Sequence, residues 1–182
     1  MSRLFYAIAA GVLAAACLGV VAYAQQPAPP PFATTKVDGT DNVYVFRYGN
    51  HQSMFVVTSA GVIATDPIGD GRPQAVVTYV DEIKKVSSQP IKYLIYSHHH
   101  FDHTAGGKPF KDAGATIVAH KRAQERLVAL KDPHTILPDE TVDVAPTITL
   151  GDTTLELRKS SDRSAALLRP LGSRHMSRWP TS

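Results

Sequence analysis

Residues 97–107 read SHHHFDHTAGG and directly follow the apolar run IKYLIY at 91–96. Neutral imidazole nitrogen and carboxylate oxygen are the zinc ligands typical of catalytic sites. If 91–97 is a strand, the first and third histidines leave its end on the same side, because side chains alternate with period two. The aspartate and the last histidine lie in the following turn and can approach the same point. We therefore predict a metal centre at the carboxyl end of a strand, where open α/β sheets place their sites. The predicted ligands are His98, His100, Asp102 and His103.

The spacing His-x-His-x-Asp-His, followed by Gly-Gly, resembles the signature of the metallo-β-lactamase-like hydrolases. The resemblance implies that His98 and His100 hold a first zinc ion, and that Asp102 and His103 help to hold a second metal where one is present. It covers residues 37–158 and implies an α/β fold: the amino-terminal half of an αβ/βα sandwich, incomplete, with a mixed β-sheet and covering helices. Some members of the family use redox-active iron, so zinc is a preference.

Other polar residues near this motif have less specific interpretations. A solvated polyhistidine run is the alternative for the motif itself, but affinity tags lie at chain ends and lack an interleaved aspartate. We expect His99 to point away from the ligands and either support them or lie at the surface. Asp66 ends an apolar strand; the resemblance implies that it buttresses the metal loop, because ligating histidines commonly donate their second N–H to such a group. Capping of the turn at Pro67 is the alternative.

The three remaining histidines of the main part of the chain are expected to have ordinary roles. His120 begins a helix, so helix capping or packing is the expected role. His51 and His134 lie in polar loops and are expected to be exposed.

Hydrophobic periodicity gives a coarse order of elements. Strands are expected at 42–48, 54–58, 62–65, 91–97, 116–119, 142–144, 147–150 and 153–158, and helices at 73–86, 104–112 and 121–130.

The first 24 residues have the pattern of a secretory signal peptide. Arg3 precedes an apolar stretch, and a small-x-small site, Ala-Tyr-Ala, ends at Ala24. A transmembrane anchor is a weaker alternative because a proline-rich linker at 25–36 follows at once, so no stable membrane span is expected after cleavage. Lipid attachment at Cys17 is a second alternative. The remaining chain has no cysteine, which excludes disulfides and thiolate ligands there. This pattern predicts a bacterial periplasmic or secreted protein.

The net charge of +3 is concentrated at the end of the chain. The last 24 residues hold five basic residues and one acidic residue, or +4, so the rest of the chain carries −1. No basic patch interleaved with aromatic residues occurs there, which argues against a nucleic-acid partner and favours a small-molecule substrate. The charge says nothing of oligomeric state.

The sequence departs from the family pattern after the strand at 153–158. The family usually takes a third histidine for the first zinc from a loop about sixty or more residues past the His-x-His pair. Here an Arg/Ser/Pro-rich tail follows at 159–182, with only His175. We expect this tail to be unstructured and hypothesise a frameshift or gene-model error; the alternative is a short protein whose tail folds back and offers His175. A half-sandwich is also expected to leave one face of its sheet open to solvent.

Two functions follow from these observations. The resemblance implies a zinc-dependent hydrolase, in which the metal lowers the pKa of water to near neutrality and the resulting hydroxide attacks an ester, lactam or related bond. Asp102 would then act catalytically by orienting that water. The alternative is a truncated, catalytically inactive, secreted metal-binding fragment, because the later ligands are missing. The fold alone does not identify a substrate.

Overall fold

The computed structural model describes residues 30–143, 147–159 and 166–170. The chain divides into two compact units, Met1–Pro31 and Phe32–Ser182, and the description below concerns the second. The expected signal peptide at 1–24, Cys17 and His175 lie outside the described residues, as does most of the expected tail. Among the described residues, no helix combines the length and apolar character that crossing a membrane requires.

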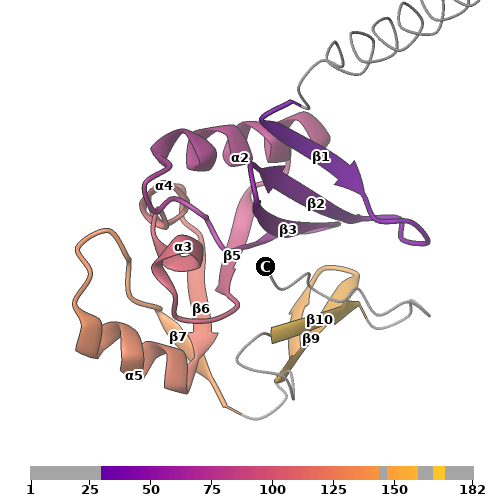
Figure 1. Ribbon diagram of the computed structural model, residues 1–182. Coiled ribbons are helices and arrows are strands. Elements are labelled where there is room, and N and C mark those ends of the chain that lie inside the picture. Colours follow the sequence, from indigo (N-terminus) through magenta and orange to yellow (C-terminus); the bar gives the residue numbers. More distant parts are fainter. Residues whose placement is uncertain (1–29, 144–146, 160–165, 171–182) are drawn as a thin grey trace, which may run out of the picture. The chain divides into compact units, whose positions relative to one another are not determined.

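The described part contains two sheets and several helices (Figure 1). The first sheet has seven strands in sequence order: β1 (Phe32–Lys36), β2 (Val43–Tyr48), β3 (His51–Thr58), β4 (Gly61–Thr65), β5 (Ile91–Tyr96), β6 (Thr116–His120) and β7 (Glu140–Val142). The second has three: β8 (Thr147–Leu150), β9 (Thr153–Lys159) and β10 (Ala166–Pro170). The helices are α2 (Pro73–Val86), α3 (Phe101–Thr104), α4 (Lys108–Asp112) and α5 (Lys121–Leu130).

The seven-stranded sheet is mixed, as the sequence predicts. Strands β1 to β4 run antiparallel to one another, whereas β4, β5, β6 and β7 run parallel. The helical segments α2 and α5 connect successive parallel strands, which is the connection that parallel pairing requires. The expected α/β class, a mixed sheet with covering helices, is confirmed.

Helices cover one face of this sheet. Helix α2 begins at Pro73, whose fixed φ suits the first turn, and its apolar residues recur at helical spacing. Tyr79 of this helix is fully buried; its ring stacks on Phe46 with the centroids 4.8 Å apart, and its hydroxyl donates to the Met54 carbonyl at 2.7 Å. Phe110 of α4 and Leu127 of α5 join the same cluster.

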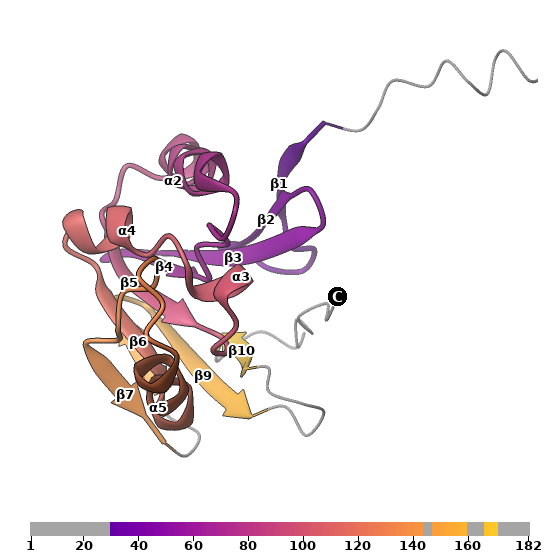
Figure 2. The same ribbon diagram turned by 60° about the vertical axis from the view of Figure 1, so that its left-hand side comes forward.

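The second face of the sheet is covered by the three-stranded sheet, which corrects the expectation of an open face. Figure 2 shows β9 on the side of the sheet opposite α2. Ile63 and Ile95 pack in one cluster with Leu155 of β9, and all three are at most 2% exposed. Asn42 Nδ2 also donates to Thr153 Oγ1 at 3.2 Å. The apolar residues of β8 and β9 alternate, so a single short sheet can bury the face that would otherwise meet water.

Two strands lie where the sequence predicts irregular structure. Strand β1 occupies part of the expected linker at 25–36 because Phe32–Lys36 pairs with β2 along its whole length. Strand β10 lies in the expected unstructured tail at 159–182 and pairs antiparallel with β9. Both add to the edge of an existing sheet and satisfy backbone groups that an edge strand leaves unpaired.

The helix expected at 104–112 is in fact two short helices, α3 and α4, separated at Gly106 and Gly107. Gly106 has φ +90°, and a Cβ there would lie 2.5 Å from Val76 Cγ2 of α2. The loop backbone also approaches Gly69, whose N–H donates to the Ala105 carbonyl at 2.9 Å. Close packing against α2 and the loop after β4 therefore interrupts the helix.

Candidate metal centre

The topology brings several chain segments to one edge of the seven-stranded sheet. Strand β3 is antiparallel to β4, and β5 is parallel to β4. The start of β3 and the ends of β4 and β5 therefore lie at the same edge. His51 opens β3, Asp66 follows β4, and Ser97 and His98 follow β5.

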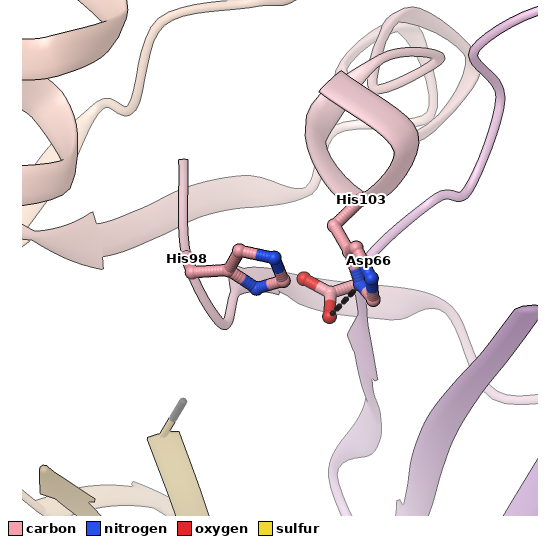
Figure 3. A group of neighbouring side chains, drawn as sticks. All are labelled: Asp66, His98 and His103. Atoms are coloured by element: carbon pink, nitrogen blue, oxygen red, sulfur yellow. Dashed lines mark hydrogen bonds and ion pairs between the residues drawn. The ribbon is translucent and has the colours of Figure 1, made fainter. Parts of the chain in front are cut away.

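Asp66 lies at the base of this cluster and is fully buried. Its Oδ1 accepts the Ser97 N–H at 2.7 Å, and its Oδ2 accepts the Ser97 hydroxyl. The same Oδ2 faces His103 Nδ1 at 3.0 Å (Figure 3). Asp66 has φ +34°, a conformation that is uncommon for a residue with a side chain. Its backbone N–H donates to the Ile95 carbonyl at 3.0 Å, and its own carbonyl accepts the Ser53 hydroxyl. These contacts hold the carboxylate against the histidine loop. They favour the role of Asp66 as a support of that loop over the alternative role of capping the turn at Pro67, which would need only contacts within the turn.

The hydrogen bonds of Ser97 determine the tautomer of His98. A hydroxyl has one hydrogen, and Ser97 Oγ donates it to Asp66. The 2.9 Å contact between Ser97 Oγ and His98 Nδ1 therefore requires that Nδ1 carries the proton and donates. Nε2 of His98 is left with a lone pair. Burial, together with neighbouring His103, lowers the pKa of His98 to about 4, so the ring is neutral at pH 7.

His103 is oriented by Asp66 in the same way. Its Nδ1 donates to the carboxylate, and its Nε2 lies 3.5 Å from Asp102 Oδ2. Burial lowers the pKa of His103, but the hydrogen bond and charge of Asp66 outweigh this effect and leave the pKa above its usual value. A cation at Nε2 would therefore compete with a proton for the same lone pair.

The predicted ligands converge around His98. Figure 3 shows its ring directed toward the pair formed by Asp66 and His103, and the ring centroids of His98 and His103 are 4.2 Å apart. Two groups have one ligand atom per residue with all these atoms within 4.8 Å of one another. The groups are Asp66, His98 and His103, and His98, His100 and Asp102. We interpret Asp66 as the support of the loop because its oxygens already accept three hydrogen bonds.

The second group fits a zinc ion by its chemistry and its spacing. Zinc ligands lie about 2.0–2.2 Å from the metal, so two donors of a tetrahedral ion are roughly 3.4 Å apart. The ligand atoms of His98, His100 and Asp102 lie within 4.8 Å of one another, so small side-chain movements would bring them to that separation. His100 is exposed and the Asp102 side chain is 38% exposed, so the group opens to solvent and to a substrate.

The family model described as the metallo-beta-lactamase superfamily matches residues 47–160. This chain belongs to that superfamily. Comparison with curated proteins gives no match.

Solved structures of metallo-β-lactamases have the same fold. BJP-1 of Bradyrhizobium japonicum, a subclass B3 enzyme, is 25% identical with a TM-score of 0.61; the match covers 77% of this chain and 57% of that one. The enzyme from Pontibacter korlensis is 19% identical with a TM-score of 0.64, and the match covers 76% of this chain and 66% of that one. The di-zinc B3 enzyme LRA-12 from an Alaskan soil metagenome is 18% identical with a TM-score of 0.62, over 79% of this chain and 61% of that one. The chain thus spans less than two thirds of the length of these metallo-β-lactamases, and its fold matches the incomplete αβ/βα sandwich implied by the sequence.

The other histidines of this superfamily member are distributed as follows. His99 is half-buried, belongs to neither donor group, and contacts the His100 ring edge-on with centroids 4.8 Å apart. Burial and neighbouring His100 lower the pKa of His99. His120 caps α5, its Nδ1 accepting the Arg122 N–H at 3.1 Å, in agreement with the expected cap. His134 is exposed, as expected.

His51 does not have the expected exposed position. It is half-buried, its Nε2 lies 3.6 Å from Asp102 Oδ2, and its ring centroid is 6.5 Å from that of His103. Burial and the nearby Arg72 guanidinium lower its pKa. Pairing of β3 with β4 was the signal that could have placed His51 here, because it puts the start of β3 beside the residue after β4.

Ser97 and Arg72 are two further contributors that the sequence analysis did not single out. Ser97 bridges Asp66 and His98, as described above. Arg72 extends from the start of α2, and its Nη2 donates to the Asp102 carbonyl at 3.4 Å. The sequence could have indicated the role of Ser97, because it is a polar residue directly before the ligand motif. It could not have indicated the contact of Arg72 with Asp102, because that contact depends on how loops distant in the sequence pack together.

Proposed function

We propose that His98, His100, Asp102 and His103 bind one or two zinc ions, with iron as the alternative metal, and that the protein is a metallo-hydrolase. The single observation that carries this proposal is the convergence of His98, His100 and Asp102 ligand atoms within 4.8 Å. It is supported by the derived tautomers of His98 and His103, which leave both Nε2 atoms free to bind a cation. Membership of the metallo-β-lactamase superfamily agrees with this chemistry.

A bound zinc ion would supply a water of pKa about 7 and polarise the bond to be cleaved. The chain's own residues would then have separate tasks. His98 and His100 would hold the first ion, and Asp102 and His103 would contribute to the second. Asp102 is partly exposed beside them, and its carboxylate would orient the attacking water. Asp66 fixes His103, and Ser97 fixes His98, so that little reorganisation is needed when the site is loaded.

The proposed substrate is a small molecule with an ester, lactam or related bond. The exposed His100 and the partly exposed Asp102 give such a molecule access from solvent. We also propose export to the bacterial periplasm or medium, which rests on the signal-peptide pattern of residues 1–24.

The test is a calorimetric zinc titration combined with elemental analysis of the purified full chain. We expect stoichiometric zinc in the wild type and loss of binding when all four ligands become alanine. His134→Ala is the matched control, because this histidine is exposed and belongs to neither donor group. Zinc binding that is the same in the fourfold variant and the control would contradict the proposal.

A second candidate function is metal binding without turnover. It is favoured by the strands that follow the site, because β8, β9 and β10 contain no histidine. Chelator-sensitive hydrolysis of chromogenic lactams and esters by the zinc-loaded protein would favour the hydrolase. Stoichiometric zinc with no turnover on any of these substrates would favour the binding protein.

A further inference from the structure

We propose that His51 supplies an imidazole ligand to a second metal position that it shares with Asp102 and His103. This inference rests on the proposed function, since it concerns the same metal centre. It adds a ligand from strand β3, a segment far in the sequence from the His-x-His motif.

The sheet fixes the position of His51. It is the first residue of β3 and pairs with Tyr48 across the β2–β3 hairpin. Two residues further along β3, the Ser53 hydroxyl donates to the carbonyl of Asp66. The backbone that carries His51 is therefore tied to the same residue that holds His103, and both imidazoles are held from one rigid base.

Two imidazole nitrogens lie near one carboxylate oxygen of Asp102, although His51, Asp102 and His103 are not a group whose ligand atoms all lie within 4.8 Å of one another. Oδ2 of Asp102 lies 3.6 Å from His51 Nε2 and 3.5 Å from His103 Nε2. Both distances exceed the 2.7–3.2 Å typical of a hydrogen bond from nitrogen to oxygen. They agree with the separation of roughly 3.4 Å expected between two ligands of a tetrahedral zinc ion. Each ring nitrogen is therefore at a suitable distance from the shared carboxylate oxygen, and the two imidazoles, whose ring centroids are 6.5 Å apart, would have to move closer to each other to share an ion.

The chemistry of the three groups suits a divalent cation. His103 Nδ1 donates to Asp66, which leaves Nε2 as the ligand atom, and this atom faces Asp102. One carboxylate and two imidazoles form a common ligand set of catalytic zinc sites, which keep a further position for water. The alternative is a simple ion pair between protonated His51 and Asp102, which would need no metal.

The first experiment compares the full-length wild type with His51→Ala and with the control His134→Ala by zinc calorimetry and elemental analysis. We expect two ions in the wild type and in the control. In His51→Ala, the affinity for the second ion should fall by at least about tenfold, the lower limit seen when a supporting group of a metal site is removed. The affinity for the first ion should be unchanged.

The second experiment replaces His51 by a different kind of ligand. In the full chain loaded with Co²⁺, His51→Cys should give a thiolate-to-cobalt charge-transfer band, since thiolate is a good ligand for such metals. His134→Cys is the matched control and should lack the band. Both proteins keep Cys17, so any signal from that residue is common to them.

The outcomes separate this inference from the proposed function. A wild type that binds no zinc overturns both. A wild type that binds a single ion, or two ions with equal affinity in His51→Ala, overturns the inference and leaves the proposed function standing. Equal charge-transfer bands in the two cysteine variants also overturn it. A band confined to His51→Cys, together with selective loss of the second ion in His51→Ala, supports it.

Discussion

Replacement of Asp66 by asparagine should weaken both the fold and the metal centre. The wild-type carboxylate accepts three hydrogen bonds, two from Ser97 and one from His103, at a position with no solvent exposure. Asparagine keeps the shape but replaces one oxygen by an NH₂ group, which cannot accept. If the NH₂ takes the place of Oδ1, one contact is lost; if it takes the place of Oδ2, two are lost.

The smaller loss sets the expected magnitude. A hydrogen bond to a charged group contributes about 1.5–3 kcal/mol, and the abandoned donor of Ser97 is left without a partner. We therefore expect Asp66→Asn to lower the free energy of unfolding by about 2–3 kcal/mol, a large part of the roughly 5–15 kcal/mol typical of a domain. Without the carboxylate, His103 also loses the contact that fixes its tautomer. Zinc affinity should then fall by about 10–100-fold.

Urea denaturation of the metal-free protein measures the first effect and zinc calorimetry the second. Asp70→Asn is the matched control, because it makes the same chemical change at an exposed position in the loop after β4. The reasoning is refuted if Asp66→Asn costs no more stability than Asp70→Asn, or if zinc affinity is equal in the two variants.

Three further changes test the packing and the charges. Gly106→Ala and Gly114→Ala impose similar backbone strain, at φ +90° and +88°, but of these two positions only 106 lacks space for a Cβ. The free energy of unfolding should therefore fall by about 1–3 kcal/mol more for Gly106→Ala than for Gly114→Ala. Equal losses in urea denaturation would refute this. The hydrogen bond from Lys111 lowers the pKa of Asp139, so its contribution to stability is present above the ordinary carboxyl pKa of 3.8 and is lost as the pH falls through the lowered value. Asp139→Asn should therefore flatten the acid end of a pH–stability profile, and an unchanged profile would contradict this. Tyr79→Phe removes a buried donor and should lower the melting temperature by an amount equivalent to about 1 kcal/mol; an unchanged melting temperature would contradict that role.

Local patterns predicted most of the fold. The helix at Pro73–Val86 has the predicted bounds because its apolar spacing and its first proline are properties of the segment itself. The break at Gly106 was not predictable in the same way, since it results from contact with Val76, which belongs to another element. Strands β1 and β10 likewise depend on pairing with a partner, which their own residues do not reveal.

The same distinction applies to the candidate site. The sequence places His98, His100, Asp102 and His103 within six positions, so their proximity follows from the chain itself. His51 lies more than forty residues earlier, in a segment that reads as an ordinary polar turn. Its place at the site follows from antiparallel pairing of β3 with β4. Hydrophobic periodicity predicts that the two segments are strands, but it does not predict which of their residues lie opposite one another.

If the proposed metal binds, its binding and folding should be coupled at this edge of the sheet. The hydrogen bonds between Asp66 and Ser97 do not depend on a metal, whereas His51 and Asp102 lie too far apart to form a hydrogen bond with each other. Zinc at a hundred times its dissociation constant would add about 2.7 kcal/mol to the stability of the folded chain. Asp66→Asn should therefore lower the stability of both the metal-free and the zinc-loaded protein. His51→Ala should leave the metal-free stability nearly unchanged and reduce only the increment that zinc provides. Because the two variants are expected to differ in this way, unfolding curves with and without zinc separate the residue that supports the loop from the residue proposed to bind the ion.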